Sequence, residues 1–599
     1  MKRIALLIIT CLMTSVIFSQ NYKFGKISKE ELSEKTHPLD STAKSAYLYK
    51  HKKVSYEFDG GTGWTVVTQV HERIKLYSKE DVNSATKKIR LYERYGKTQK
   101  VSSLKAYTYN LEGGKIKKEK LSKKQIFLKE TSKNWKLKIF TMPNLKEGSI
   151  VEWSYRKTSP YEGYIDKIDL QHDIPIKKLN VLVKIPEYFV FKINYKGYLQ
   201  LYFKESSKNR VINYSYRTNG NSTSAGGTTT KYTERVDLRE KHYGLVQDNV
   251  PALGDDEPYV ANIETYRRGA KFELAMTKFP NAMPKYFATD WEDVSQKIYK
   301  TGAFGGELSR ASYFKNDLAT VLNGVTTDFG KIGAIFQFVK SKVKWNGYYS
   351  KYTDVGVKKA YNEGVGNSAD INLMLTAMLR EAGLNANPVI LSARNHGTPI
   401  VPTIDGFNYV IAAVTFPQGN ILLDATEIYS VPNVLPIRAL NWQGRIIRKD
   451  GSSNWVSLEP NKKALEEHNL SVKVSDDGMV EGILRTKYGE VYALNFRNRY
   501  NHIKEDDLIS KSEEDYNIEI ENFKISNKTK IGKPVTRLIK FKSEDLVEGI
   551  NGKLYINPLL FLTNTVNPFK AEDRKFPVDF DTPWKRKTTV NIAIPEGYV

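Results

Sequence analysis

Alternation of apolar and polar residues marks the first third of the chain. Over residues 64–76 the apolar side chains fall on one face of an extended segment, and polar ones such as Arg73 and Lys75 fall on the other. This period of two residues is typical of a half-buried β-strand. A second extended segment at 104–109 leads into a glycine-containing turn, as the first strand of a hairpin does. Many short strands separated by turns predict a β-sandwich-like domain of unknown function over residues 40–250.

The pattern changes to helical periodicity in the middle of the chain. One predicted helix begins near Thr327 or Asp328, either of which is suited to cap it. Its apolar stripe has the spacing i, i+3, i+4, i+7, i+11 and consists of Ile332, Ile335, Phe336, Val339 and Val343. A second helix at 373–382 ends before Gly383. Strands are expected to follow at 388–393, 407–416 and 421–425. Together these elements predict an α+β domain over residues 255–455.

Strand-like alternation returns from about residue 460, and a polar helical stretch at 505–516 interrupts it. The chain ends at Val599 directly after a strand-like segment at 589–594, so the last region is expected to be either a complete or a truncated domain. We expect a β-rich C-terminal domain over residues 460–599. The predicted fold class is therefore multidomain α+β, with β-rich domains on both sides of a central α+β domain.

The first residues have the features of a secretory signal. Lys2 and Arg3 precede an apolar run at 4–18, which is too short to span a membrane as a helix and ends at the small residue Ser19. We predict that residues 1–19 are a signal peptide and that the protein is exported to the periplasm or the cell surface of a bacterium. An uncleaved membrane anchor is the alternative.

Cys11 is the only cysteine and lies in this leader, so the mature chain would contain no thiol. Disulfides, thiolate metal sites and a cysteine nucleophile are thereby excluded. The histidines are dispersed without metal-ligand spacing, and the sequence has no phosphate-binding loop, dinucleotide fingerprint or zinc-binding helix motif. We therefore expect neither a metal nor a cofactor.

The chain is strongly basic, with a formal net charge of +25, and removal of Lys2 and Arg3 would leave 25 − 2 = +23. In an exported protein such a charge suits an anionic envelope surface as well as solubility alone. The densest basic stretch includes Lys115, Lys117, Lys118, Lys120, Lys123 and Lys124. Because no nucleic-acid-binding fold signature accompanies it, we do not expect nucleic acid as a partner.

The segment 364–384 carries most of the functional information. A glycine-rich turn leads into an amphipathic helix, and Ser368 lies at or near the start of that helix. Unpaired N–H groups and the positive end of the helix dipole favour an anion at such a place. A cysteine there would have a lowered pKa, whereas a serine hydroxyl still needs a base to remove its proton.

These residues resemble the transglutaminase-like superfamily, whose members share a papain-like Cys-His-Asp arrangement. The family has Gly-x-Cys-x-Asp at the start of a helix, followed by one strand with the histidine and another with the aspartate. In this sequence Ser368 stands in the place of the cysteine and Tyr409 in the place of the histidine, while Asp424 is kept. The resemblance covers about 329–447 and implies a papain-like fold for the central domain. The N-terminal region also looks like an uncharacterised domain that precedes such domains in exported bacterial proteins.

Two of the three catalytic positions thus differ from the family, which predicts a pseudoenzyme with no catalytic residue. Tyr409 is a poor base because a phenol has a pKa of about 10, and we expect it to donate a hydrogen bond to Asp424. The protein would then bind a polypeptide or glycan of the cell envelope without cleaving it. One alternative is a hydrolase or acyl transferase that uses Ser368 with a base such as His396, which lies in the loop after the helix. Another is a structural spacer or assembly protein.

Overall fold

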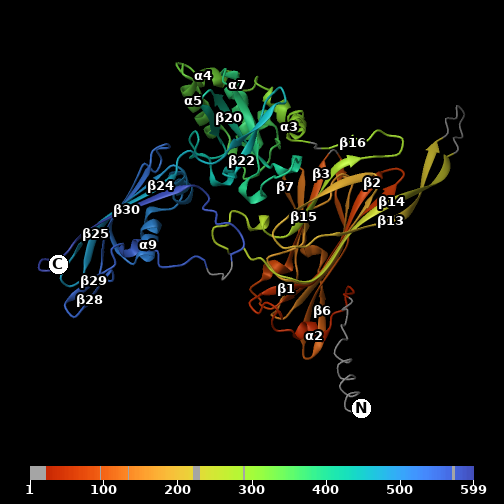
Figure 1. Ribbon diagram of the computed structural model, residues 1–599, viewed down its shortest axis with the longest axis horizontal. Coiled ribbons are helices and arrows are strands. Elements are labelled where there is room, and N and C mark those ends of the chain that lie inside the picture. The colour runs from red at the N-terminus through yellow and green to blue at the C-terminus, as the bar shows by residue number, and fades with distance from the viewer. Residues whose placement is uncertain are drawn as a thin grey trace, which may run out of the picture. The chain divides into compact units, whose positions relative to one another are not determined.

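The computed structural model describes residues 22–94, 96–132, 134–219, 229–255, 257–287, 290–569 and 574–599. The expected signal peptide, with Cys11, lies outside these residues. The chain forms two compact units, of which the first comprises Met1–Gly254 and Arg267–Lys285 and the second comprises Asp255–Tyr266 and Tyr286–Val599. Strands predominate over helices, and along the sequence β-rich parts precede and follow a central α+β domain (Figure 1), so the predicted fold class is confirmed. Within the described residues no helix is long and apolar enough to cross a membrane.

The first unit is built on one eight-stranded sheet, in which only the pair β1–β11 is parallel. Its strands, in spatial order, are β13 (Lys204–Asn219), β14 (Thr229–Val250), β11 (Ile176–Pro186), β1 (Ser45–Asp59), β2 (Gly63–Leu76), β9 (Ile150–Ser159), β5 (Lys100–Glu112) and β6 (Lys115–Lys120). The predicted hairpin after residue 104 is the pair β5–β6. The lysine-rich strand β6 therefore forms one edge of this sheet.

Two smaller sheets pack on one face of the large sheet and enclose apolar cores with it. One contains β10 (Ile168–Asp169), β15 (Gly269–Thr277) and β12 (Phe189–Lys196), and the other contains β4 (Lys97–Thr98), β3 (Thr86–Arg94), β8 (Trp135–Thr141) and β7 (Ile126–Ser132). Val66 of β2 packs in the core with Phe189, and Ile74 of the same strand packs in the core with Phe140. This layering matches the predicted sandwich-like architecture.

On the opposite face of β2, Arg73 and Lys75 are not exposed but are covered by the N-terminal segment, whereas Gln69 is exposed. Arg73 is 2% exposed and donates to the carboxylates of Glu31 and Glu152 at 2.8 and 2.9 Å. Lys75 donates to the carbonyl oxygens of Leu32 and Gly148. The short helix α2 (Lys29–Ser33) belongs to this cover. The domain expected from residue 40 therefore includes residues 22–39, because alternation identifies the polar face of a strand but not what covers it.

The two compact units do not divide at a single point near residue 255. Residues 267–285 were expected in the α+β domain, but β15 pairs along its length with β12 and joins the first unit. This pairing brings together residues some eighty positions apart, such as Phe189 and Thr277. A pattern read locally along the chain does not reveal such a partner.

The central domain packs helices against an antiparallel sheet of five strands. In spatial order these are β21 (Gly419–Leu423), β20 (Tyr409–Phe416), β19 (Ala386–Leu391), β22 (Gln443–Ile447) and β23 (Ser453–Ser457). The helices are α3 (Trp291–Tyr299), α4 (Lys315–Val321), α5 (Asp328–Lys342), α6 (Val357–Glu363) and α7 (Ser368–Glu381). The buried helix α7 lies along β20 and β19 (Figure 1). Both helices predicted for this region are present, and Thr327 caps α5 by accepting a hydrogen bond from the Gly330 amide.

The C-terminal part contains a second five-stranded sheet in the order β26 (Glu519–Ser526), β27 (Val535–Ser543), β25 (Val480–Gly489), β24 (Ala464–Val474) and β30 (Trp584–Ala593). The other elements are α8 (Val491–Tyr500), the predicted polar helix α9 (Glu505–Tyr516), and the hairpin of β28 (Val547–Ile550) and β29 (Lys553–Ile556). Ala464, Val491 and Leu494 share an apolar core with residues of the central sheet. The boundary expected between 455 and 460 therefore does not separate two compact units.

Candidate functional site

Ser368 is the first residue of α7, as the sequence predicts. Its neighbour Asn367 caps the helix by accepting hydrogen bonds from the amides of Ala369 and Asp370 at 2.9 and 2.8 Å. The Asp370 carboxylate completes the capping box by accepting from the Asn367 amide at 3.0 Å. The helix start is thus held by side chains on both sides of Ser368, which fixes where its hydroxyl lies.

The Ser368 hydroxyl is fully buried and engaged by the backbone of a single residue, Ser350. Its Oγ donates to the Ser350 carbonyl oxygen at 2.8 Å and accepts from the Ser350 amide at 2.8 Å. A hydroxyl has one proton to donate. Ser368 already donates it in a hydrogen bond to a carbonyl oxygen, which is too weak a base to remove it. Among the described residues Ser368 has no hydrogen bond to a histidine, to Tyr409 or to Asp424.

The segment around Ser350 is tied down at several points over the start of α7. The Ser368 amide donates to the Tyr348 carbonyl at 3.2 Å, and the Asn367 side chain donates to the Tyr352 carbonyl at 3.0 Å. The buried Lys351 ammonium donates to the Phe407 carbonyl at 2.9 Å, just ahead of β20. This segment therefore covers the position at which the family places its nucleophile.

Tyr409, the first residue of β20, is brought together with Asp424, and the expected hydrogen bond is present. The phenol donates to Asp424 Oδ2 at 2.9 Å, lies 2.7 Å from Thr426 Oγ1, and accepts from Arg438 Nε at 3.2 Å. Burial, followed by the negative charge of Asp424, raises the pKa of Tyr409 well above its ordinary value of 10. The phenol therefore stays neutral and serves as a hydrogen-bonding group.

Asp424 follows β21 and is linked to α7 through Asn372, which the sequence analysis did not single out. The Asn372 amide donates to Asp424 Oδ1 and to the Val410 carbonyl, each at 2.9 Å, and its oxygen accepts from the Ala425 amide at 2.9 Å. Asn372 stands four residues after Ser368 and so lies on the same helix face. This spacing of four residues is the feature of the sequence from which a position of Asn372 near Ser368 could have been predicted.

Arg438 is the second residue that sequence reasoning missed. It donates to Thr426 Oγ1 at 2.8 Å as well as to Tyr409, and its guanidinium lies 4.4 Å from the centre of the Trp345 ring. Burial alone would lower the pKa of Arg438, but Tyr409, Asp424 and Glu427 raise it above its ordinary value. A permanent positive charge thus balances Asp424 beside the position where the family has histidine.

His396 lies in an exposed short helical turn, Arg394–His396, and its Nε2 makes a hydrogen bond of 3.0 Å with the Asp405 carbonyl. Since a carbonyl only accepts, Nε2 carries the proton in this contact. Ser368 and His396, the residues of the predicted serine–histidine pair, are thus hydrogen-bonded to different backbone segments, at Ser350 and at Asp405. Within the described parts of the chain, no group of three or more His, Cys, Asp or Glu side chains is arranged to hold a metal ion.

Three family models match the sequence. The transglutaminase-like superfamily matches residues 316–425, a domain of unknown function with a solved structure (DUF3857) matches 64–225, and a second such domain (DUF3858) matches 552–599. None of the curated proteins matches the chain.

Two solved structures match this chain at low sequence identity. The crystal structure of a proposed protease from Parabacteroides distasonis is 12% identical, with a TM-score of 0.48, over 83% of this chain and 93% of that chain. That of a proposed cysteine protease from Cytophaga hutchinsonii is 14% identical, with a TM-score of 0.16, over 42% of this chain and 77% of that chain. This chain contains a transglutaminase-like core domain flanked by the DUF3857 and DUF3858 domains.

Proposed function

We propose that this is an exported, non-catalytic member of the transglutaminase-like class that binds a polypeptide or glycan of the bacterial cell envelope. The observation that carries the non-catalytic part is the pair of hydrogen bonds between the Ser368 hydroxyl and the backbone of Ser350. A serine nucleophile requires a base that takes its proton in the transition state. Here the hydroxyl is buried and its proton points to a carbonyl oxygen.

The residue in the place of the family histidine supports the same proposal. With a pKa raised above 10, fewer than about one Tyr409 phenol in a thousand is ionised at neutral pH. Its hydrogen bonds join Asp424 and Arg438 in a buried polar network, which is a structural role. Removal of triad members lowers turnover by several powers of ten, because the three residues act as a unit.

Binding in the envelope is supported by the surface charge of the first unit. All the lysines of β6 are exposed on an edge strand, and Lys123 and Lys124 follow them on the surface. Exposed cations of this density attract anionic surfaces and steer acidic partners. Lysines also protect an edge strand against pairing with other chains, so their charge serves the stability of the monomer as well.

The core shared by the central and C-terminal domains favours an additional structural role for the central domain. Val491 and Leu494 of α8 pack with Tyr409 and Leu422 in one apolar cluster. The network at the former triad position thus forms part of the support of the C-terminal domain. A domain with such a role retains its fold when catalysis has been lost.

Labelling with a serine-directed fluorophosphonate probe tests the proposal. The chain from residue 20 onward and its Ser368→Ala variant are incubated with the probe and analysed by mass spectrometry. We expect no labelling at Ser368. Labelling that disappears in Ser368→Ala would instead establish the hydrolase alternative, and its loss in His396→Ala would identify the base.

A further inference from the structure

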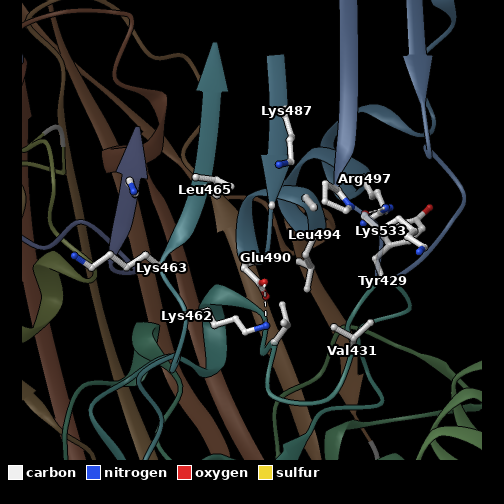
Figure 2. A pocket seen from close by; sticks show the side chains of 16 residues that line it. Tyr429, Val431, Lys462, Lys463, Leu465, Lys487, Glu490, Leu494, Arg497 and Lys533 are labelled. Atoms are coloured by element: carbon white, nitrogen blue, oxygen red, sulfur yellow. Dashed lines mark hydrogen bonds and ion pairs between the residues drawn. The ribbon is translucent and has the colours of Figure 1, made fainter. Parts of the chain in front are cut away.

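A half-open surface cavity of about 320 Å³ lies in the second unit, outside the matched transglutaminase-like core. Three of its lining residues, Tyr429, Val431 and Val434, come from the segment after β21. The others come from the segment before β24, from β24, β25 and β30, from α8 with its N-cap, and from the loop before β27 (Figure 2). Pockets that hold small molecules range from roughly 300 to 1,000 Å³, so this cavity has the size of a small ligand.

The lining combines apolar side chains with several cations. The apolar members are Val431, Val434, Leu465, Ala493, Leu494 and Pro534, and the lysines are Lys462, Lys463, Lys487, Lys533 and Lys585. The pairing of three neighbouring strands brings these lysines together. Leu465 of β24 pairs with Lys585 of β30 on one side and with Gly489 of β25 on the other. Sheet order therefore brings together cations that are more than a hundred residues apart in the sequence.

Part of this positive charge is not neutralised by the protein. Lys487 lies 2.9 Å from Glu467, and Lys462 lies 3.7 Å from Glu490, an ion pair drawn in Figure 2. The exposed residues Lys463, Lys533 and Lys585 form no ion pair within the described parts of the chain. Glu490 is the only acidic residue of the described lining.

Two further features support a positive potential in the cavity. The pKa of the nearby Glu467 is lowered, first by the hydrogen bond from Lys487 and then by the charges of Lys487, Lys587 and Lys585. Helix α8, which is ten residues long, begins at the cavity wall, and the N-terminal end of a helix carries a partial positive charge. Its N-cap, Glu490, adopts a φ of 53°, a strained conformation of the kind that clusters at binding sites.

The wall that carries Lys533 is held in place by a buried arginine. Arg497 is 2% exposed and donates to the carbonyl oxygens of Asn527, Lys528, Lys530 and Lys533 at 2.7–3.2 Å. Its guanidinium is therefore used for the loop rather than for a ligand. The loop is fixed before any ligand enters, which lowers the ordering cost of binding.

We propose that this cavity binds a small organic anion in which one carboxylate or phosphate group is attached to an apolar body. The unpaired lysines would hold the anionic group, and the leucine and valine side chains would bury the apolar part. A purely inorganic anion leaves the apolar wall without a partner, and a neutral apolar molecule leaves the lysines without one. This site does not depend on the state of the former triad.

Ligand-detected NMR titration of the mature chain tests the proposal with four probes: octanoate, octyl phosphate, 1-octanol and acetate. Octanoate or octyl phosphate should bind with a Kd in the millimolar range, as is usual for a ligand of about ten non-hydrogen atoms. Comparison of these two probes distinguishes a carboxylate from a phosphate ligand. The proposal would be overturned if either 1-octanol or acetate bound as tightly as octanoate.

Charge variants assign the binding to this cavity. Lys463→Gln combined with Lys585→Gln should raise the Kd of the anionic probe by roughly two- to fivefold for each lysine removed, the range expected for partly exposed ion pairs. The matched control combines Lys449→Gln with Lys553→Gln, two exposed lysines of the second unit outside the lining. All four lysines are exposed, so the variants should fold, and circular dichroism checks this. An unchanged Kd in the double variant, or an equal loss in the control, would contradict the site.

Discussion

The side-chain amide of Asn372 donates to the carboxylate of Asp424 at 2.9 Å, so that α7 is tied to the end of β21 one helical turn beyond Ser368. The same amide group also bonds to the backbone at Val410 and Ala425. Three hydrogen bonds from one buried side chain thus set the distance between the helix and the two strands that carry Tyr409 and Asp424. Together with Tyr409 and Asp424, Asn372 forms a structural joint between the helix and these strands.

Asn372→Ala should therefore destabilise the second unit strongly. It removes the hydrogen bonds that Asn372 makes to Asp424 Oδ1, the Val410 carbonyl and the Ala425 amide. Each buried polar group that is left unsatisfied costs about 1–3 kcal/mol. We expect a loss of at least about 2 kcal/mol in the free energy of unfolding, measured by urea denaturation. The control is Asn323→Ala at an exposed position. A loss no larger than that of the control would show that the joint is not formed in solution.

A cysteine at position 368 should react slowly with thiol reagents. The chain from residue 20 onward contains no cysteine, so Ser368→Cys would carry the only thiol. Because Ser368 is fully buried beneath the Ser350 segment, we expect its reaction with a chromogenic disulfide to be at least about tenfold slower than that of Ser341→Cys, which is exposed on α5. Equal rates would mean that the segment opens readily and exposes the nucleophile position.

The buried charges under the N-terminal segment should make the first unit sensitive to acid. Burial raises the pKa of Glu152, but hydrogen bonds from His71 and Arg73 and the charge of Arg73 lower it below its ordinary value of 4.5 overall. A carboxyl with a lowered pKa stabilises the fold above its unfolded pKa and loses this contribution as the pH falls through the folded value. Stability should therefore be constant near neutrality and fall below about pH 4.5.

Glu152→Gln separates this effect from general acid denaturation. Loss of one partner of a buried ion pair costs about 3–5 kcal/mol, so the variant should be less stable than the wild type at neutral pH. The difference in stability between the wild type and the variant, called the gap below, should become smaller as the pH falls. The reason is that protonation of Glu152 removes the same charge from the wild type. Thermal unfolding between neutrality and pH 3 measures the gap. A gap that is independent of pH would show that the Glu152 charge does not stabilise the fold.

The lysines of β6 should promote association with anionic surfaces. Combined replacement of Lys117, Lys118 and Lys120 by glutamine should weaken binding to phosphatidylglycerol vesicles by about 1 kcal/mol per lysine. Wild-type binding should also fall steeply as salt increases. A control with the same change in net charge replaces Lys449, Lys511 and Lys553, which are exposed in the second unit. Equal weakening by both sets of changes would show that net charge rather than this strand is responsible.

Local periodicity was sufficient to predict most individual elements. The apolar stripe from Ile332 to Val343 gave α5, and the glycine after residue 382 marked the end of α7. These signals depend on neighbours a few residues apart, which the sequence displays directly. The resemblance of the segment around Ser368 to a known family supplied the arrangement of Tyr409 and Asp424, which periodicity alone does not give.

Features that depend on distant contacts were not predictable in this way. Arg73 and Lys75 read as exposed because they are charged, yet helix α2 and its flanking residues cover them. The engagement of Ser368 by Ser350 depends on how an irregular segment folds back over a helix. The lysines of the C-terminal cavity meet only through the order of β25, β24 and β30.

Turnover of a substrate mixture by the chain from residue 20 onward, compared with that of its Ser368→Ala variant, tests the central claim most directly. A peptide library is incubated with each protein in the presence of a labelled amine, and both cleavage and amine incorporation are followed by mass spectrometry. We predict that neither protein gives products above background. Products formed by the wild type and absent with Ser368→Ala would contradict the account and show that Ser368 is a working nucleophile.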